Sequence, residues 1–156
     1  MLRISRKAST TLSLVLTAGL MAVIIAGAIM MPWLADLLIE MPYNPNRADI
    51  TVAERVLIFV AAYGALAAAA SADVALFFLL RSVHSGQVFT SRVVALLRAI
   101  SWCCFVFAAM FACLTWYFAL AAVVAFCAVF VGVCLRVVKN CFEEAVALKN
   151  ENDFTI

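Results

Sequence analysis

The sequence predicts an all-α fold, an integral membrane four-helix bundle, and three observations lead to that class. Of the 156 residues, 68% are hydrophobic and only 13% are charged, and the mean hydropathy is +1.13. Soluble domains are closer to half apolar and a quarter charged, and a small soluble fold could not bury this much apolar surface. Four long apolar runs are separated by short polar connections. We therefore expect one membrane domain covering residues 1–156.

The first apolar run, residues 12–34, follows three basic residues and is predicted to be the first span. A cleaved signal peptide also begins with basic residues, but its apolar core is shorter than this run. Ala18, Ala22 and Ala26 recur at every fourth position, a pattern that allows close helix packing in lipid. Residues 32–50 contain three prolines and several acids, so they are expected to break the helix and form the one sizeable loop.

The second helix has a clear predicted start, because Thr51-Val52-Ala53-Glu54 has the sequence of a capping box. Its span is placed at residues 56–80, and the helix should continue to a C-cap at Gly86. A helix this long exceeds the thickness of a bilayer, so its end should protrude into water. The third span is placed at residues 95–116, in a helix that begins after an N-cap at Thr90.

The fourth span is placed at residues 119–138, and a helical extension is expected over residues 139–156. Small and apolar residues alternate four and three apart along its end, which predicts a packed seam: Cys134, Val138, Cys141, Ala145 and Leu148. We expect that seam to lie against the end of the second helix and the turn at Phe89. The terminal tail would fold onto the same place and complete a knob.

Basic residues set the expected orientation in the membrane. They gather at the chain start, near the second-to-third connection and after the fourth span: Arg3, Arg6, Lys7, Arg81, Arg92, Arg98, Arg136 and Lys139. The other side carries only Arg47 and Arg55. The positive-inside rule therefore places both termini in the cytoplasm, with the ends of helices two and four protruding there. The expected location is the cell (inner) membrane, as a multi-pass protein surrounded by the lipid bilayer.

Asp73 is the sharpest candidate for a functional residue, because it lies inside the second apolar run after a stretch of small residues. A carboxylate near the middle of a membrane costs about 2.5–3.5 kcal/mol on insertion scales. We expect a buried polar tie, in which Asp73 is protonated or bonded to Ser71, Ser101 or Arg98. The alternative is a carboxylate that carries protons in a small transporter.

The other polar residues give no pattern of an enzyme. The six cysteines lie in or beside apolar runs and include no C-x-x-C pair, and the chain has a single histidine. They are expected to be small apolar fillers between helices rather than metal ligands or disulfides. No nucleophile–base set, phosphate loop or metal motif is present. We therefore expect no catalytic residue, metal or cofactor, and the net charge of +2 gives no reason to expect direct nucleic-acid binding.

Two stretches resemble the DUF2975 family of small bacterial four-helix membrane proteins of unknown function. The first is a G-x-x-F-x-x-x-x-V-x-x-L-R-x-I element between helices two and three, here Gly86, Phe89, Val94, Leu97, Arg98 and Ile100. The second is the closing LK-x-E-N-D-L-T-I element, here Leu148 to Ile156 with Phe154 in place of Leu. Arg92 also replaces a frequent Asn of the first element.

The resemblance implies a partner, because members are often encoded beside a small Cro-like helix-turn-helix regulator. The expected function is therefore a non-enzymatic membrane protein that docks a cytoplasmic partner such as this regulator. The alternatives are a small transporter or proton-linked permease component that uses Asp73, and an immunity-type membrane protein. The candidate functional residues are Asp73, Arg98, Phe89, Glu151, Asn152 and Asp153.

Overall fold

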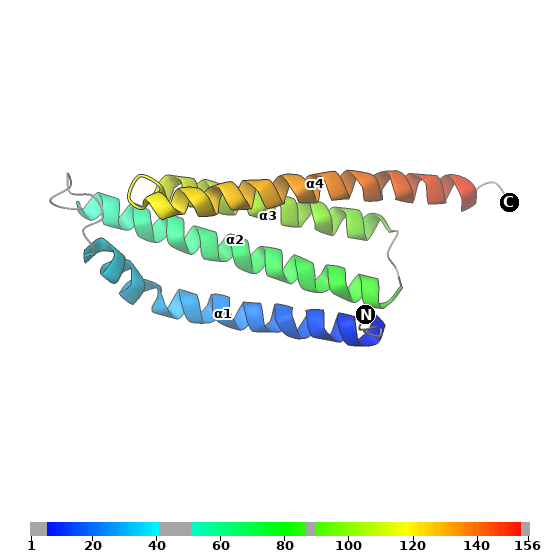
Figure 1. The fold of residues 1–156 in the computed structure, drawn as a ribbon, viewed down its shortest axis with the longest axis horizontal. Helices are drawn as coiled ribbons and strands as arrows, with labels where there is room; N and C mark the ends of the chain where they lie inside the picture. The colour runs from blue at the N-terminus through cyan, green and yellow to red at the C-terminus, as the bar shows by residue number, and fades with distance from the viewer. Residues whose placement is uncertain (1–5, 41–50, 87–89, 154–156) are drawn as a thin grey trace, which may run out of the picture.

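The computed structural model describes residues 6–40, 51–86 and 90–153, and these residues form four antiparallel helices (Figure 1). The helices are α1 (Arg6–Glu40), α2 (Val52–His84), α3 (Ser91–Leu114) and α4 (Ala119–Asp153). Each is long and apolar enough to cross a membrane. The prediction of an all-α chain with four apolar helices is thus confirmed.

The helix ends follow from local sequence. At the start of α2, the backbone N–H of Thr51 donates to Glu54 Oε2 at 2.9 Å, and the N–H of Glu54 donates to Thr51 Oγ1 at 3.4 Å, so the predicted capping box is confirmed. After α2, Gly86 has a φ of +78°, a conformation that glycine adopts without steric cost. At Thr90, the N-cap of α3, the side chain makes no capping hydrogen bond.

The expectation that the helix breaks at Pro32 is wrong for residues 32–40. Pro32 lies inside α1, which continues to Glu40. Proline removes one backbone donor and crowds the preceding turn, and this bends a helix without always ending it. The apolar residues that follow keep the helix going, and Figure 1 shows the bend near the blue-to-teal change. The rest of the predicted loop, residues 41–50, lies outside the described residues.

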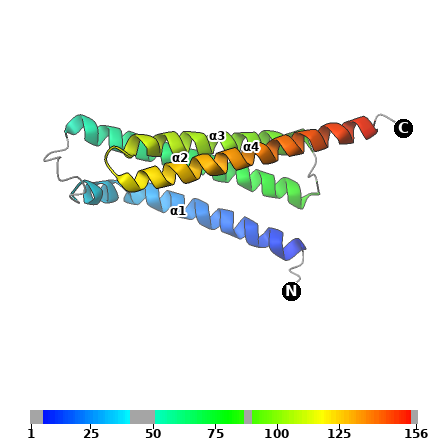
Figure 2. The ribbon, with the colours of Figure 1, turned by 45° about the horizontal axis from the view of Figure 1, so that its top comes forward.

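The helices lie side by side in chain order, in an open array rather than a closed bundle. Among the described residues, α1 packs only on α2, α2 on α3, and α3 on α4. Figure 2 shows α1 leaning away from the other helices toward its N-terminal end. The array has two different ends. The start of α1, the end of α2, the start of α3 and the end of α4 lie at one end, which we call the basic end. The α3–α4 turn lies at the other, which we call the turn end (Figures 1 and 2).

One cluster of the apolar core lies at the turn end. There, buried apolar side chains of α2, α3 and α4 form one cluster: Ile58, Ala61, Leu114 and Ala121. The outward faces are apolar too, since Ile29 is 76% exposed, Leu120 72% and Phe126 73%. Soluble monomers rarely expose contiguous apolar surface on this scale. Lipid around the array accounts for it, so composition and structure agree on a membrane protein.

The sequence prediction of how α4 packs is wrong about the side of the helix. The predicted seam faces outward, with Val138 42% and Leu148 62% exposed, and the backbone of α4 lies along α3 rather than along α2. In α1, Ala18, Ala22 and Ala26 are all exposed, so this small-residue stripe lies on the outer surface of the chain. The less exposed residues of α4 also recur four and three positions apart, but they lie on a different side of the helix from the predicted seam. They are Ala121, Ala125, Ala128, Gly132, Leu135, Lys139, Phe142 and Val146.

Candidate functional site

Asp73 is buried in α2, as the sequence predicts, but without the predicted tie. Asp73 is 4% exposed, and its Oδ1 atom has no hydrogen-bond partner among the described residues. The three expected partners bond elsewhere: Ser71 Oγ donates to Ala67 O at 2.8 Å, Ser101 Oγ to Gly132 O at 2.9 Å, and Arg98 Nη2 to Glu143 Oε1 at 3.4 Å. The polar atom of Asp73 is thus buried without the compensation that such groups normally have.

The register of α1 against α2 places a second buried polar residue near Asp73. Two contacts fix this antiparallel register: Arg55 Nη2 to Asp36 Oδ1 at 2.6 Å, and Tyr63 Oη to Ala28 O at 3.3 Å. Continued along both helices, it brings Asp73 level with Ala18, the neighbour of Thr17. Thr17 is 5% exposed, and its hydroxyl donates to Leu14 O at 2.9 Å. The two buried polar residues, Asp73 and Thr17, therefore lie at about the same level along the α1–α2 pair.

A group of charged side chains lies between α3 and α4 near the basic end. Glu143 joins two cations, since Arg98 donates to its Oε1 atom and Lys139 donates to its Oε2 atom. Arg98 and Glu143 are about half exposed, whereas the Lys139 side chain is only 14% exposed. The Lys139–Glu143 pair is one helical turn apart, a spacing that brings side chains together on one helix.

Arg136 completes this group from α4. Its guanidinium carbon lies 5.2 Å from the Trp102 ring centre and 5.6 Å from that of Phe105, which is the geometry of a cation–π contact. Arg98, Ser101, Arg136 and Lys139 line a cavity of about 50 Å³. We call these four residues and their cavity the basic pocket.

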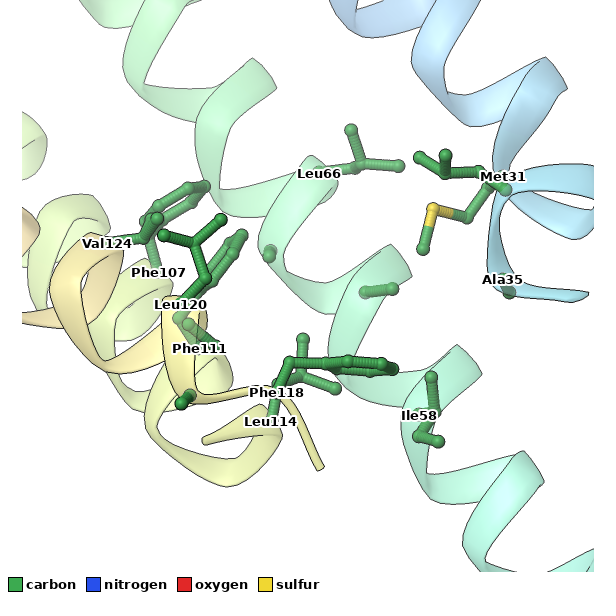
Figure 3. A pocket seen from close by; sticks show the side chains of 15 residues that line it. Met31, Ala35, Ile58, Leu66, Phe107, Phe111, Leu114, Phe118, Leu120 and Val124 are labelled. Carbon is green, nitrogen blue, oxygen red and sulfur yellow. The ribbon is translucent and has the colours of Figure 1, made fainter. Parts of the chain in front are cut away.

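A large apolar cavity lies near the turn end (Figure 3). It measures about 510 Å³, and all four helices contribute to its lining, for example Met31, Leu66, Phe111 and Val124. Asp73 is not among its lining residues, and none of them is charged. A cavity of this chemistry can hold an acyl chain or another apolar group, but it offers no group for acid–base work.

The cysteines do not gather into a site in the part of the chain that the structure describes. No group of three or more His, Cys, Asp or Glu side chains could hold a metal ion there. Cys103 and Cys104 are half-buried, but the other four cysteines are exposed: Cys113, Cys127, Cys134 and Cys141. The prediction that cysteines fill space between helices is therefore wrong for these four.

The other candidates that the structure describes, Arg98, Glu151, Asn152 and Asp153, lie toward the basic end. Helix α4 continues through Glu151, Asn152 and Asp153, and the Glu151 side chain is exposed. Phe89 lies outside the described residues, as do residues 154–156. The structure thus brings Arg98 together with Glu143 and Lys139 but does not join it to Asp73.

Sequence reasoning missed three members of the charged group: Arg136, Lys139 and Glu143. From the sequence, Arg136 and Lys139 were used only as signals of orientation, and Glu143 was given no role. The i,i+4 spacing of Lys139 and Glu143 was the available signal for one contact. The pairing with Arg98 could not be found that way, because it depends on how α3 is placed against α4.

Helices of this length and hydropathy, with apolar outer faces, define a multi-pass membrane protein. A family model described as "Protein of unknown function (DUF2975)" matches residues 14–156, and the chain belongs to that family. The resemblance seen in the two sequence elements is thus confirmed. No curated protein and no solved structure matches the chain.

Proposed function

We propose that this chain is a non-enzymatic protein of the cell membrane that docks a cytoplasmic partner through the end of α4. In this proposal both termini are cytoplasmic, because the basic residues lie overwhelmingly at the basic end and the positive-inside rule assigns that end to the cytoplasm. The docking element is residues 139–153, which we call the terminal segment.

The observation that carries the proposal is the length of α4. It has 35 residues, whereas its packing neighbour α3 has 24, a difference of about 16 Å at 1.5 Å per residue. Figures 1 and 2 show the red end of α4 extending beyond the ends of α2 and α3. A helix that continues past its neighbours needs another surface to cover its apolar side.

The terminal segment has the chemistry of a docking helix. Leu148 is 62% exposed, and Glu144, Lys149 and Glu151 around it are also exposed. An apolar position framed by charges is the arrangement that a partner groove recognises on an amphipathic helix. Acidic residues outnumber basic ones after Asn140, so the segment complements a basic surface.

We propose that the partner is a small helix-turn-helix regulator. The support is twofold: such regulators are often encoded beside members of this family, and proteins that bind DNA carry basic surfaces. An acidic helix at the membrane would hold the regulator near the bilayer.

Site-specific crosslinking in native membranes tests the proposal. A photoreactive residue at Leu148 should capture the regulator, whereas the same residue at Leu120 should not. Leu120 is a matched control because it is 72% exposed and lies on the same helix, but at its start beside the α3–α4 turn. Capture at both positions, or at neither, would contradict docking by the terminal segment. A variant that lacks residues 151–156 and still captures the regulator fully would place docking elsewhere.

One observation favours a second candidate, a proton-linked transporter that uses Asp73. A buried carboxyl group whose Oδ1 atom has no partner is unusual in lipid-embedded helices and often belongs to a proton path. The apolar cavity does not reach Asp73, however, and this makes docking the better-supported function. Loss of a proton-coupled flux in Asp73→Asn, with stability unchanged, would favour transport.

A further inference from the structure

The basic pocket gathers more positive charge than the acidic side chain beside it neutralises. Three cations from two helices line one small cavity: Arg98, Arg136 and Lys139. Glu143 bonds to Arg98 and Lys139, but Arg136 has no acidic partner among the described residues. Two positive charges thus remain after Glu143 is counted. The cavity of about 50 Å³ has room for more than one water-sized group.

The depth of the pocket matches the level of lipid headgroups. Arg136 is 17 residues after the start of α4, and Arg98 is 16 residues before the end of α3, so both lie about 25 Å from the turn end. The hydrocarbon core of a bilayer is about 30 Å thick. With the α3–α4 turn at one interface, the pocket therefore lies near the other. Trp102, whose ring lies 5.2 Å from the Arg136 guanidinium carbon, is 56% exposed, so lipid can reach it beside the pocket.

We propose that the basic pocket binds the phosphate group of an anionic phospholipid. Lys139 and Arg136 would donate to the phosphate oxygens, since basic pockets between membrane helices are suited to anionic headgroups. Arg98 would also donate to the phosphate while it keeps its contact with Glu143. Ser101 already donates to Gly132 O, so it forms the wall of the pocket rather than a phosphate donor. Glu143 competes with the phosphate for Arg98 and Lys139. Removing the negative charge of Glu143 should therefore raise the affinity of the pocket for the phosphate.

The test uses Trp102 as a local reporter in full-length protein reconstituted into vesicles. Trp33→Phe and Trp116→Phe leave Trp102 as the only tryptophan, since the chain has three. Quenching by brominated phosphatidylglycerol is compared with quenching by brominated phosphatidylcholine in mixed vesicles. The expected result is a preference for the anionic lipid of about fivefold or more, because each nearby cation contributes about that factor.

Charge variants identify the pocket as the source of the preference. Arg136→Gln and Lys139→Gln should each reduce it about fivefold, Arg136→Lys should keep most of it, and Glu143→Gln should increase it. Arg81→Gln is the matched control, because Arg81 is an exposed cation near the basic end that does not line the pocket. The preference is a ratio within one variant, so a change in Trp102 brightness does not affect it.

Three outcomes would overturn the proposal. Equal quenching by the two lipids would show that no anionic site lies beside Trp102. An equal loss in Arg81→Gln and Arg136→Gln would assign the preference to general surface charge. If an excess of inorganic phosphate abolished the preference, the pocket would be a site for a free anion rather than for a lipid. A preference that survives inorganic phosphate and is lost only in the pocket variants supports the lipid assignment.

Discussion

Replacing Asp73 by leucine should stabilise the protein, and the reason is the missing hydrogen bond at its carboxyl group. Asp73 is 4% exposed, and its Oδ1 atom has no partner among the described residues. Leaving a buried polar group unsatisfied costs about 1–3 kcal/mol, and Asp73→Leu removes that group. We therefore expect the free energy of unfolding to rise by about 1–3 kcal/mol. Asp73→Asn keeps a polar group of the same shape, so it should give no such gain.

The measurement is reversible unfolding of the two variants and the parent protein in mixed detergent micelles, followed by circular dichroism. The reasoning would be refuted if Asp73→Leu were destabilised by about 1 kcal/mol or more while Asp73→Asn matched the parent. That pattern would mean that Asp73 makes a hydrogen bond, with the hydroxyl of Thr17 on the facing helix as the first partner to test. A stabilised Asp73→Leu would show that Asp73 is retained at a cost to stability, as functional groups in membranes often are.

The two interior glycines give the remaining predictions, because their surroundings differ. At Gly132 an added Cβ would lie 3.3 Å from Cys104 Cβ, an atom fixed to the backbone of α3, so Gly132→Ala should lower the unfolding free energy by about 1 kcal/mol. At Gly64 the closest atom is Met110 Sδ at 3.1 Å, on a flexible side chain that can turn away, so Gly64→Ala should be tolerated. Both are measured by the same detergent unfolding, and the opposite order of stability would contradict this description of the α2–α3 and α3–α4 contacts.

The sequence was sufficient wherever a local rule applied. Hydropathy predicted four apolar helices, and the capping box at Thr51 marked the start of α2 correctly. The family elements at Gly86 and at the terminus were recognised from spacing alone, and the family is confirmed over residues 14–156. Each of these signals depends on residues close together in the chain.

The sequence failed where the answer depends on which side of a helix meets its neighbour. A membrane helix carries apolar side chains on all of its sides. The difference between an apolar and a polar face, which marks the buried side of a helix in a soluble protein, is therefore absent. The seam through Leu148 was therefore assigned to the wrong side of α4. Partners of Asp73 and Arg98 were misjudged for the same reason, because helix phase and register decide them.

The cytoplasmic orientation of the basic end is the claim on which the docking proposal depends, and cysteine labelling in intact cells tests it most directly. Ala53→Cys and Ser85→Cys are introduced separately into a variant whose six native cysteines are replaced by alanine. Both positions are exposed, at opposite ends of α2. The account predicts that a membrane-impermeant maleimide labels the cysteine at position 53 in intact cells and the one at position 85 only after permeabilisation. Labelling at position 85 but not at position 53 in intact cells would contradict it.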